Sequence, residues 1–273
     1  MIHSAITISL VPEARGGPFV FRDGLAAGCA KAAEFGFDAV EIFPRSTEEM
    51  NAKDLKRLLT QHKLKLAAMG TGAGWVVHQL RLTDPDAKIR AQAHAFISSI
   101  IDFAGSFGAP AIVGSMQGRS EGSVTREQAF DWLREHLEQL GPRANALGVP
   151  LLFEPLNRYE TNLVRSVAEG LELLKPLRTK NVKLLLDLFH ANIEEASIAD
   201  ALRLAGNDLG HVHFADSNRQ AVGLGHTDFA PIAEALAGVG FNGYASAEIF
   251  PLPDSETAAK QTIASFRKWF RPD

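Results

Sequence analysis

Four side chains that can bind a metal ion or move a proton lie at the ends of apolar segments in the second half of the chain. They are Glu154, Asp187, His213 and Glu248. A carboxylate at the end of a buried strand costs several kcal/mol of desolvation unless a cation or hydrogen-bond donors meet it. Three carboxylates brought together would also repel one another strongly at a site of low dielectric constant. A divalent cation bound among them would relieve both costs.

The donor set predicts the kind of metal. Three carboxylates and one imidazole suit Mn²⁺, Mg²⁺ or Co²⁺ better than a metal that prefers thiolates. We therefore expect one divalent ion, Mn²⁺ first, with Co²⁺ or Mg²⁺ as the alternatives. Taken singly, the residues have plainer interpretations: Glu154 could pair with its neighbour Arg158, and a lone strand histidine is more often a core residue. Four such residues at equivalent positions favour a single metal site.

Eight short apolar runs recur along the chain, and a polar turn and a helical pattern follow each of them. The runs are Ile2–Ile8, Ala39–Phe43, Leu64–Met69, Ala111–Val113, Val149–Phe153, Val182–Leu186, Leu209–Phe214 and Tyr244–Ile249. Strands that alternate with helices indicate βαβ units in a parallel sheet. Eight units in this length predict an α/β fold, a single (β/α)8 TIM barrel over residues 1–273. The alternative is a doubly wound open sheet, but its G-x-G-x-x-G pattern after the first strand is missing.

In such a barrel the four candidate ligands come from the last four strands, at the end where barrel active sites lie. Two loops at this end, Gly70–Gln79 and Gly114–Gly122, are longer than packing requires and rich in glycine. Loops at a barrel mouth often cover the site. We expect Trp75 and His78 to lie over the substrate and contact it. The alternative is that these are ordinary surface loops with no role at the site.

Composition limits the classes of function. The chain is 46% hydrophobic and 22% charged, its net charge is −4, and its pI is about 6.1, so no broad basic surface is available for nucleic acid. The single cysteine, Cys29, excludes an internal disulfide and a cysteine-based zinc site. The N-terminus lacks the features of a secretory signal, and no apolar run approaches the roughly 20 residues of a membrane span. We expect a soluble cytoplasmic protein that binds no membrane.

Several motifs resemble the D-tagatose/D-psicose 3-epimerases, a group of xylose isomerase-like barrels. They are Glu154-x-x-Asn157-Arg158-x-Glu160, Asp187-x-x-His190-x-Asn192, Gly210-His211-x-His213 followed by Asn218-Arg219, and the terminal Glu248. The resemblance implies that Glu154, Asp187, His213 and Glu248 hold one metal ion and that Glu154 and Glu248 also transfer the proton. It further implies that Glu160, His190 and Arg219 hold the oxygens of a small sugar. The Gly70–Gln79 and Gly114–Gly122 loops do not match epimerase loops, which leaves the identity of the sugar, and whether it is phosphorylated, open.

The chemistry that follows is proton transfer beside a carbonyl group. A cation on vicinal carbonyl and hydroxyl oxygens acidifies the neighbouring C–H and stabilises a cis-enediolate. Two glutamates on opposite faces of the carbon would epimerise a ketose or keto-sugar at C3, which the resemblance favours. We expect both to stay ionised at neutral pH because the cation favours the charged form. A single base that returned the proton to the adjacent carbon would give an aldose–ketose or hydroxypyruvate-type isomerase instead.

Other functions stay open. A dehydratase or lyase that acts on a keto-sugar, keto-inositol or keto-glycoside would use the same metal and the same proton abstraction. An apurinic endonuclease shares this barrel but needs several metal ions and a basic face, which the net charge disfavours. A sugar-binding barrel without activity is a further alternative. Arg219 could bind a hydroxyl group or a phosphate, or simply pair with Asp216. The assembly could be a homodimer or a homotetramer.

Overall fold

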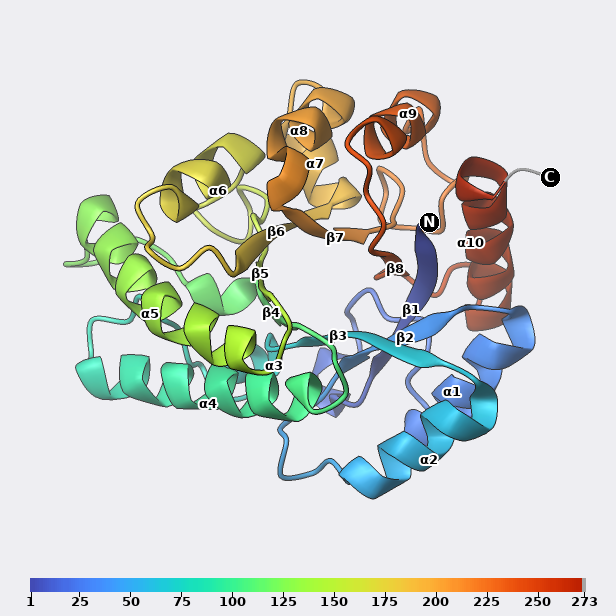
Figure 1. Cartoon of the computed structure of the whole chain (residues 1–273), viewed down its shortest axis with the longest axis horizontal. Helices are drawn as coiled ribbons and strands as arrows, with labels where there is room; N and C mark the ends of the chain where they lie inside the picture. Colours follow the sequence, from blue (N-terminus) through green and yellow to red (C-terminus); the bar gives the residue numbers. More distant parts are fainter. Residues whose placement is uncertain (272–273) are drawn as a thin grey trace.

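In the computed structural model, which describes residues 1–271, eight parallel strands form a closed barrel in chain order (Figure 1). The strands are β1 His3–Ser9, β2 Ala39–Phe43, β3 Lys65–Gly70, β4 Ala111–Val113, β5 Leu151–Phe153, β6 Val182–Asp187, β7 Leu209–His213 and β8 Tyr244–Ala247. The prediction of a (β/α)8 TIM barrel is confirmed. Strand β5 begins two residues later than expected, because Pro150 has no N–H group to donate to the sheet. Strand β8 ends at Ala247, so Glu248 follows the strand.

Helices surround the barrel and connect successive strands (Figure 1). The longer ones are α1 Leu25–Phe35, α2 Ala52–His62, α4 Ala87–Gly105, α5 Arg126–Ala146, α6 Val167–Leu174, α7 Leu188–Glu194, α8 Ile198–Ala205, α9 Ala230–Gly238 and α10 Ser255–Phe270. Most begin at a residue whose side chain accepts a backbone N–H of the first turn, as Asn51 does for α2 and Ser166 for α6. Shorter turns, α3 Ala73–Val76 and η2 Ser115–Gln117, lie inside the two long loops.

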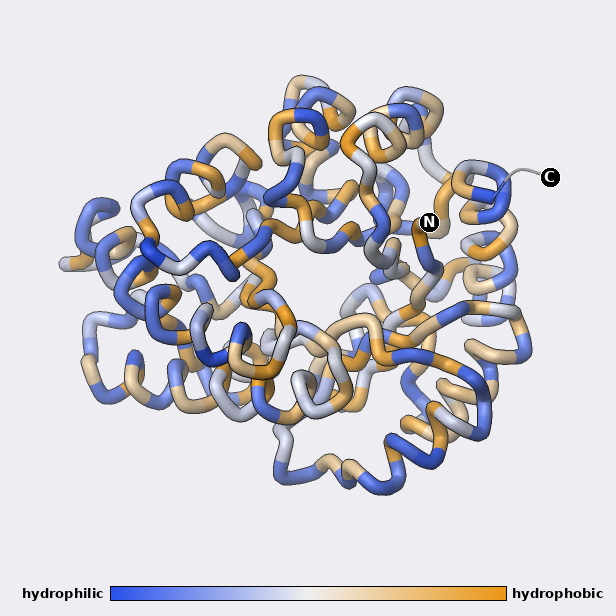
Figure 2. Tube along the Cα trace, in the orientation of Figure 1, coloured by the Kyte–Doolittle hydropathy of each residue, from blue (hydrophilic) through white to orange (hydrophobic). Residues whose placement is uncertain are grey.

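The core has one large cluster and several smaller ones. Apolar side chains between the strands and the helices form the large cluster, in which Leu55, Ile97 and Leu133 are fully buried. The helices accordingly alternate apolar and polar residues as their faces turn toward and away from the barrel (Figure 2). A smaller cluster of Ala68, Ile112, Leu152 and Leu185 lies apart from this layer. Among residues 1–271, no helix has both the length and the apolar composition needed to cross a bilayer.

Candidate active site

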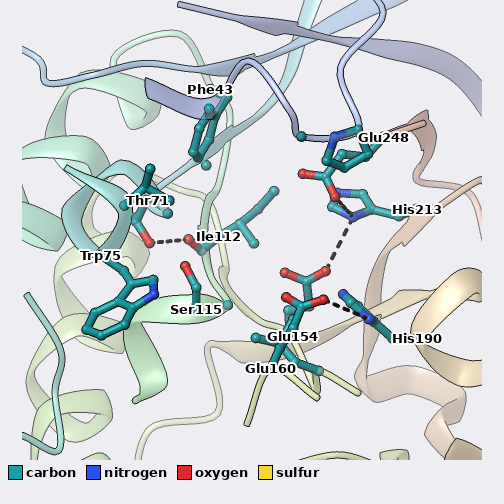
Figure 3. A pocket seen from close by; sticks show the side chains of 18 of the residues that line it. Phe43, Thr71, Trp75, Ile112, Ser115, Glu154, Glu160, His190, His213 and Glu248 are labelled. Carbon is teal, nitrogen blue, oxygen red and sulfur yellow. Dashed lines mark hydrogen bonds and ion pairs between the residues drawn. The ribbon is translucent and has the colours of Figure 1, made fainter. Parts of the chain in front are cut away.

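The four candidate ligands converge at the C-terminal end of the barrel. Asp187 and His213 are the last residues of β6 and β7, and Glu154 and Glu248 directly follow β5 and β8. From Nδ1 of His213, the nearest oxygens of Glu154, Asp187 and Glu248 lie at 3.4, 3.5 and 3.7 Å. Figure 3 shows Glu154 and Glu248 approaching His213 from different sides of the cavity. The structure thus brings together all four residues that the strand ends singled out.

These residues fit a divalent cation. Within residues 1–271, Oε1 of Glu154, Oδ2 of Asp187 and Nδ1 of His213 are buried and have no hydrogen-bond partner. A buried polar atom without a partner costs about 1–3 kcal/mol, so three in one place require an explanation. With Glu248 they offer three oxygens and one nitrogen, a set that suits a hard or borderline divalent ion. Atoms of Asp187, His213 and Glu248 all lie within 4.8 Å of one another, as a shared ion requires.

Arg219 supplies a positive charge to the same group. Its Nη2 atom lies 3.1 Å from Oδ2 of Asp187 and also donates a hydrogen bond to Glu248. Its backbone has a φ of 57°, in the left-handed region, within the tight loop that follows β7. An ion pair between Arg219 and Asp216 was the alternative, and it is wrong. The Asp216 carboxylate instead accepts the backbone N–H groups of Ser217, Gly223 and Thr227, at 2.7, 2.8 and 3.1 Å, and so shapes the loop that carries Arg219.

His190 and Glu160 reach the same cavity. Nδ1 of His190 lies 2.7 Å from Nδ2 of Asn157, and this amide also donates to Oε1 of Glu160 at 3.0 Å. Burial lowers the pKa of His190 to about 3, so the imidazole is neutral and available for hydrogen bonds to hydroxyl groups. Burial also raises the pKa of Glu160.

Arg158 is turned away from the candidate metal site. Its side chain pairs with Glu194, with 2.8 Å between Nε and Oε1. The interpretation of Glu154 as the partner of Arg158 is therefore wrong.

Burial acts differently on the three carboxylates. It raises the pKa of Glu154 to about 7 and raises the pKa of Glu248 above its ordinary value. Burial would also raise the pKa of Asp187, but the Arg219 guanidinium outweighs it and holds that pKa below its ordinary range. The protein groups alone therefore shift both glutamates toward the neutral form. A bound cation would shift both back toward the charged form.

A cavity of about 710 Å³ opens above these groups. Its floor includes Glu154, His213 and Glu248, and its walls include Phe43 and Trp75 (Figure 3). An apolar wall with a few convergent polar groups is typical of a site for a small molecule.

Both long loops contribute residues to the cavity wall, but not all of the residues that we expected. Trp75 lines the cavity from α3, and Ser115, Gly118 and Arg119 line it from the loop after β4. Oγ1 of Thr71 donates to the carbonyl oxygen of Ile112 at 2.7 Å, which ties the loop after β3 to strand β4. Of the residues that the structure describes, His78 is not among those lining the cavity, and its exposed ring lies 5.9 Å from that of Phe96. The structure does not bring His78 to the site.

Sequence reasoning missed Glu41, which lies in the middle of β2 and lines the cavity floor. It is 2% exposed, and its Oε1 lies 3.3 Å from Nε2 of His213. The sequence did contain a feature that could have identified it: Glu41 is the single charged residue inside the apolar run Ala39–Phe43. It also missed Phe189, whose ring lies 4.8 Å from the Arg219 guanidinium.

Comparison with known proteins agrees with this geometry. The family model of the xylose isomerase-like TIM barrels matches residues 29–269. A D-psicose 3-epimerase of Ruminiclostridium cellulolyticum is 33% identical over 229 residues, which make up 81% of this chain and 76% of that protein. A 3-dehydro-D-guloside 4-epimerase of Escherichia coli is 36% identical over 119 residues, 44% of each protein. The fold is also that of a solved D-psicose 3-epimerase with D-tagatose from Clostridium cellulolyticum H10, with a TM-score of 0.82, 24% identity, and coverage of 99% and 100%. The chain therefore belongs to the xylose isomerase-like TIM barrel family, and over most of its length it is similar to a D-psicose 3-epimerase.

Proposed function

We propose that this protein is a divalent-metal-dependent ketose 3-epimerase, which inverts the carbon beside the carbonyl group by proton transfer. The observation that carries the proposal is the placement of two glutamates around one point. Glu154 and Glu248 come from strands three apart in the closed barrel, and both carboxylates lie within 4 Å of Nδ1 of His213. Two carboxylates on different sides of one carbon are what an epimerase needs. The relatives named as ketose epimerases support the same reading.

The proposed metal ligands are Glu154, Asp187, His213 and Glu248, with Mn²⁺ as the first choice of ion. When bound, a divalent cation polarises the carbonyl oxygen of the sugar and stabilises the negative charge that develops as the proton leaves. The three unpartnered buried atoms described above support this assignment.

The residues of the chain then move the proton. One glutamate, in its ionised form, takes the proton from C3, and the other, protonated, returns a proton to the opposite face. Arg219, His190 and Glu160 are proposed to hold the hydroxyl groups of the sugar. The apolar walls around Phe43 and Trp75 keep bulk water from the reacting carbon.

A substrate panel in D₂O tests this reaction. Free and phosphorylated ketoses are incubated with the protein and Mn²⁺, and the products are analysed by chromatography and NMR. We expect the C3 epimer of a ketose with one deuterium at C3. An aldose product would favour the isomerase, and release of water or an alcohol would favour the dehydratase or lyase. Epimerisation without solvent deuterium would contradict the two-base mechanism.

The two glutamates are tested by Glu154→Gln and Glu248→Gln. Glutamine keeps an oxygen for the metal but cannot carry the proton. A placed general base is worth roughly 10²–10⁴-fold, so turnover of each variant should fall at least a hundredfold. Metal content, measured by inductively coupled plasma mass spectrometry, should fall much less. A variant that retains a tenth of the activity would exclude that glutamate as a proton carrier.

A second candidate substrate is a keto-sugar that carries a glycosidic substituent. The cavity of about 710 Å³ extends from the carboxylates to Phe19, Val76 and Phe250, well beyond what a single pentose or hexose fills. The apolar outer part could accept a second ring. Adding 3-keto-glycosides to the panel decides between the two classes, because a free ketose alone should then be turned over poorly. Size-exclusion chromatography with light scattering tests whether the protein is a homodimer or a homotetramer.

A further inference from the structure

Glu41 is a charged residue buried on the inside of the barrel, where it faces β7. Its Oε2 accepts a hydrogen bond from Nε2 of His211 at 3.0 Å, and its Oε1 accepts one from Oγ1 of Thr7 at 3.1 Å. The same Oε1 lies 3.3 Å from Nε2 of His213. The mechanism proposed above uses neither Glu41 nor His211. A buried carboxylate costs several kcal/mol unless it is paired, so its position needs a reason.

The strand pairing is irregular beside both ends of this contact. The β2–β3 register shifts between Val40 and Glu41, and the β6–β7 register shifts between Leu184 and Leu185, so that Gly210 is passed over. Irregularities of this kind re-aim the side chains beside them. On β7 the two histidines that follow, His211 and His213, both reach Glu41.

The two nitrogens of His213 face different carboxylates. Four carboxylates lie within 4 Å of the ring nitrogens of His213. Nδ1 faces Glu154, Asp187 and Glu248, and Nε2 faces Glu41. A neutral imidazole has one N–H group and one lone pair, and the hydrogen bond at one nitrogen decides which nitrogen carries the proton. A proton on Nε2, directed at Glu41, leaves the lone pair of Nδ1 facing the three carboxylates. A histidine that binds a metal commonly donates its other N–H to a carboxylate in this way.

Glu41 is suited to act as a fixed acceptor. Both of its oxygens already accept hydrogen bonds, one from Thr7 and the other from His211, at 3.1 and 3.0 Å. Nε2 of His211 holds Oε2 of Glu41, which leaves Oε1 directed toward Nε2 of His213 before any ligand binds.

We infer that Glu41 is a positioning residue, which holds the proton of His213 on Nε2 and thereby presents Nδ1 as the metal ligand. The inference rests on the proposed metal-dependent function. Glu41, His211 and His213 could instead bind a second metal ion, since their ligand atoms lie within 4.8 Å of one another. That arrangement would cost the hydrogen bond between Glu41 and His211, and it would require His213 to lose the protons of both nitrogens. An arrangement in which Nε2 of His213 keeps its proton, 3.3 Å from Oε1 of Glu41, needs neither change.

Metal binding tests the inference without an activity assay. Calorimetric titration with Co²⁺ compares the wild type with Glu41→Gln, which keeps the shape of the side chain but removes its charge. Loss of a carboxylate behind a metal-binding histidine typically weakens affinity 10- to 100-fold, and we expect a loss of about this size. Thr7→Val is the matched control: it removes a hydrogen bond from the same carboxylate but leaves its charge opposite His213, so the Co²⁺ affinity should stay near that of the wild type. A stoichiometry of two ions, or equal affinity in Glu41→Gln, would overturn the inference.

The protonation of His213 gives a readout that does not depend on the variant folding. NMR of ¹⁵N-histidine-labelled wild-type protein should show a slowly exchanging proton on Nε2 of His213 in the metal-free form. In the Mg²⁺-loaded form, Nδ1 should carry no proton. A proton on Nδ1 of the loaded form, or an Nε2 proton that exchanges freely in both forms, would overturn the inference. A wild type that binds no divalent cation would contradict the proposed function, while the Nε2 proton of the metal-free form would still decide whether Glu41 positions His213.

Discussion

At the residue scale, the position of Glu154 depends on a glycine at the end of the neighbouring strand. Gly114 directly follows β4, and a methyl group on its Cα would overlap Oε2 of Glu154. The overlapped atom is the far end of a flexible side chain, so the carboxylate would move rather than the backbone. The absence of a side chain at Gly114 therefore leaves the space in which Glu154 faces His213.

We predict that Gly114→Ala lowers metal affinity and turnover by at least about tenfold, because Glu154 is displaced. A tenfold loss of affinity corresponds to about 1.4 kcal/mol of binding free energy. The fold should persist, as judged by circular dichroism. The matched control is Gly238→Ala in α9, where an added Cβ meets nothing within 4 Å and where alanine favours the helix. Wild-type affinity in Gly114→Ala would show that Glu154 has room to bind the ion from another rotamer.

At the scale of elements, the loop after β3 is a structured wall rather than a free lid. It contains the helix α3, and Thr71 ties it to Ile112 in strand β4. Trp75 lines the cavity and lies near Arg81, with 5.6 Å between the guanidinium carbon and the ring centre. This wall is where substrates of different length would be distinguished.

We predict that Trp75→Ala changes the ratio of turnover between short and long substrates by roughly tenfold, the low end of what one apolar contact contributes to discrimination. The ratio is measured as relative kcat/KM over the panel of ketoses and keto-glycosides. Trp132→Ala is the control, because Trp132 lies on α5 against Arg90 and is not a cavity residue within the described chain. If both variants leave the ratio unchanged, Trp75 has only a structural role.

A second feature at this scale is a histidine pair that joins α4 and α5. The Nδ1 atoms of His94 and His136 lie 3.0 Å apart, so one ring donates to the other and the accepting nitrogen carries no proton. Burial is the main cause of the low pKa of each ring, and the pKa of His136 falls from 6.5 to about 4. Between these pH values the unfolded chain binds more protons than the folded one, so the free energy of unfolding falls as the pH falls.

We predict that this pair costs up to about 2 kcal/mol of stability as the pH falls from 7 to 4.5, allowing for its partial exposure. Urea unfolding at several pH values measures the loss. The double variant His94→Gln/His136→Gln keeps polar groups between the helices but removes the titration. Its free energy of unfolding should depend less on pH over this range. The same dependence in both proteins would assign the effect to other groups.

At the scale of the whole molecule, the proposed metal ion would join four consecutive strands. Its ligands come from β5 to β8, so binding should favour the closed barrel over the unfolded chain. A ligand present at a hundred times its Kd adds about 2.7 kcal/mol to the free energy of unfolding.

For a domain of this size we predict that Mn²⁺ raises the Tm by roughly 5–10 °C over protein treated with EDTA. Asp187→Asn should lose most of this shift, because Asp187 Oδ2 is one of the unpartnered buried atoms. Scanning fluorimetry measures both. A shift of equal size in Asp187→Asn would place the ion elsewhere.

The sequence by itself determined the barrel and the four residues at its rim. Alternating apolar runs and helical patterns are local properties, and eight of them specify a closed parallel barrel. Since parallel strands all end on one side, residues at equivalent strand ends must meet there whatever the loops do. The sequence alone was therefore enough to identify the four residues at the rim, which are Glu154, Asp187, His213 and Glu248.

Only the tertiary structure decided the contacts between side chains that are distant in the chain. Glu41 and His211 are 170 residues apart, and only closure of the barrel brings β2 and β7 face to face. Arg219 turns toward Asp187 rather than its neighbour Asp216, because backbone N–H groups already occupy the Asp216 carboxylate. His78 turns to Phe96 because side-chain direction in a loop follows local backbone angles rather than a repeating period.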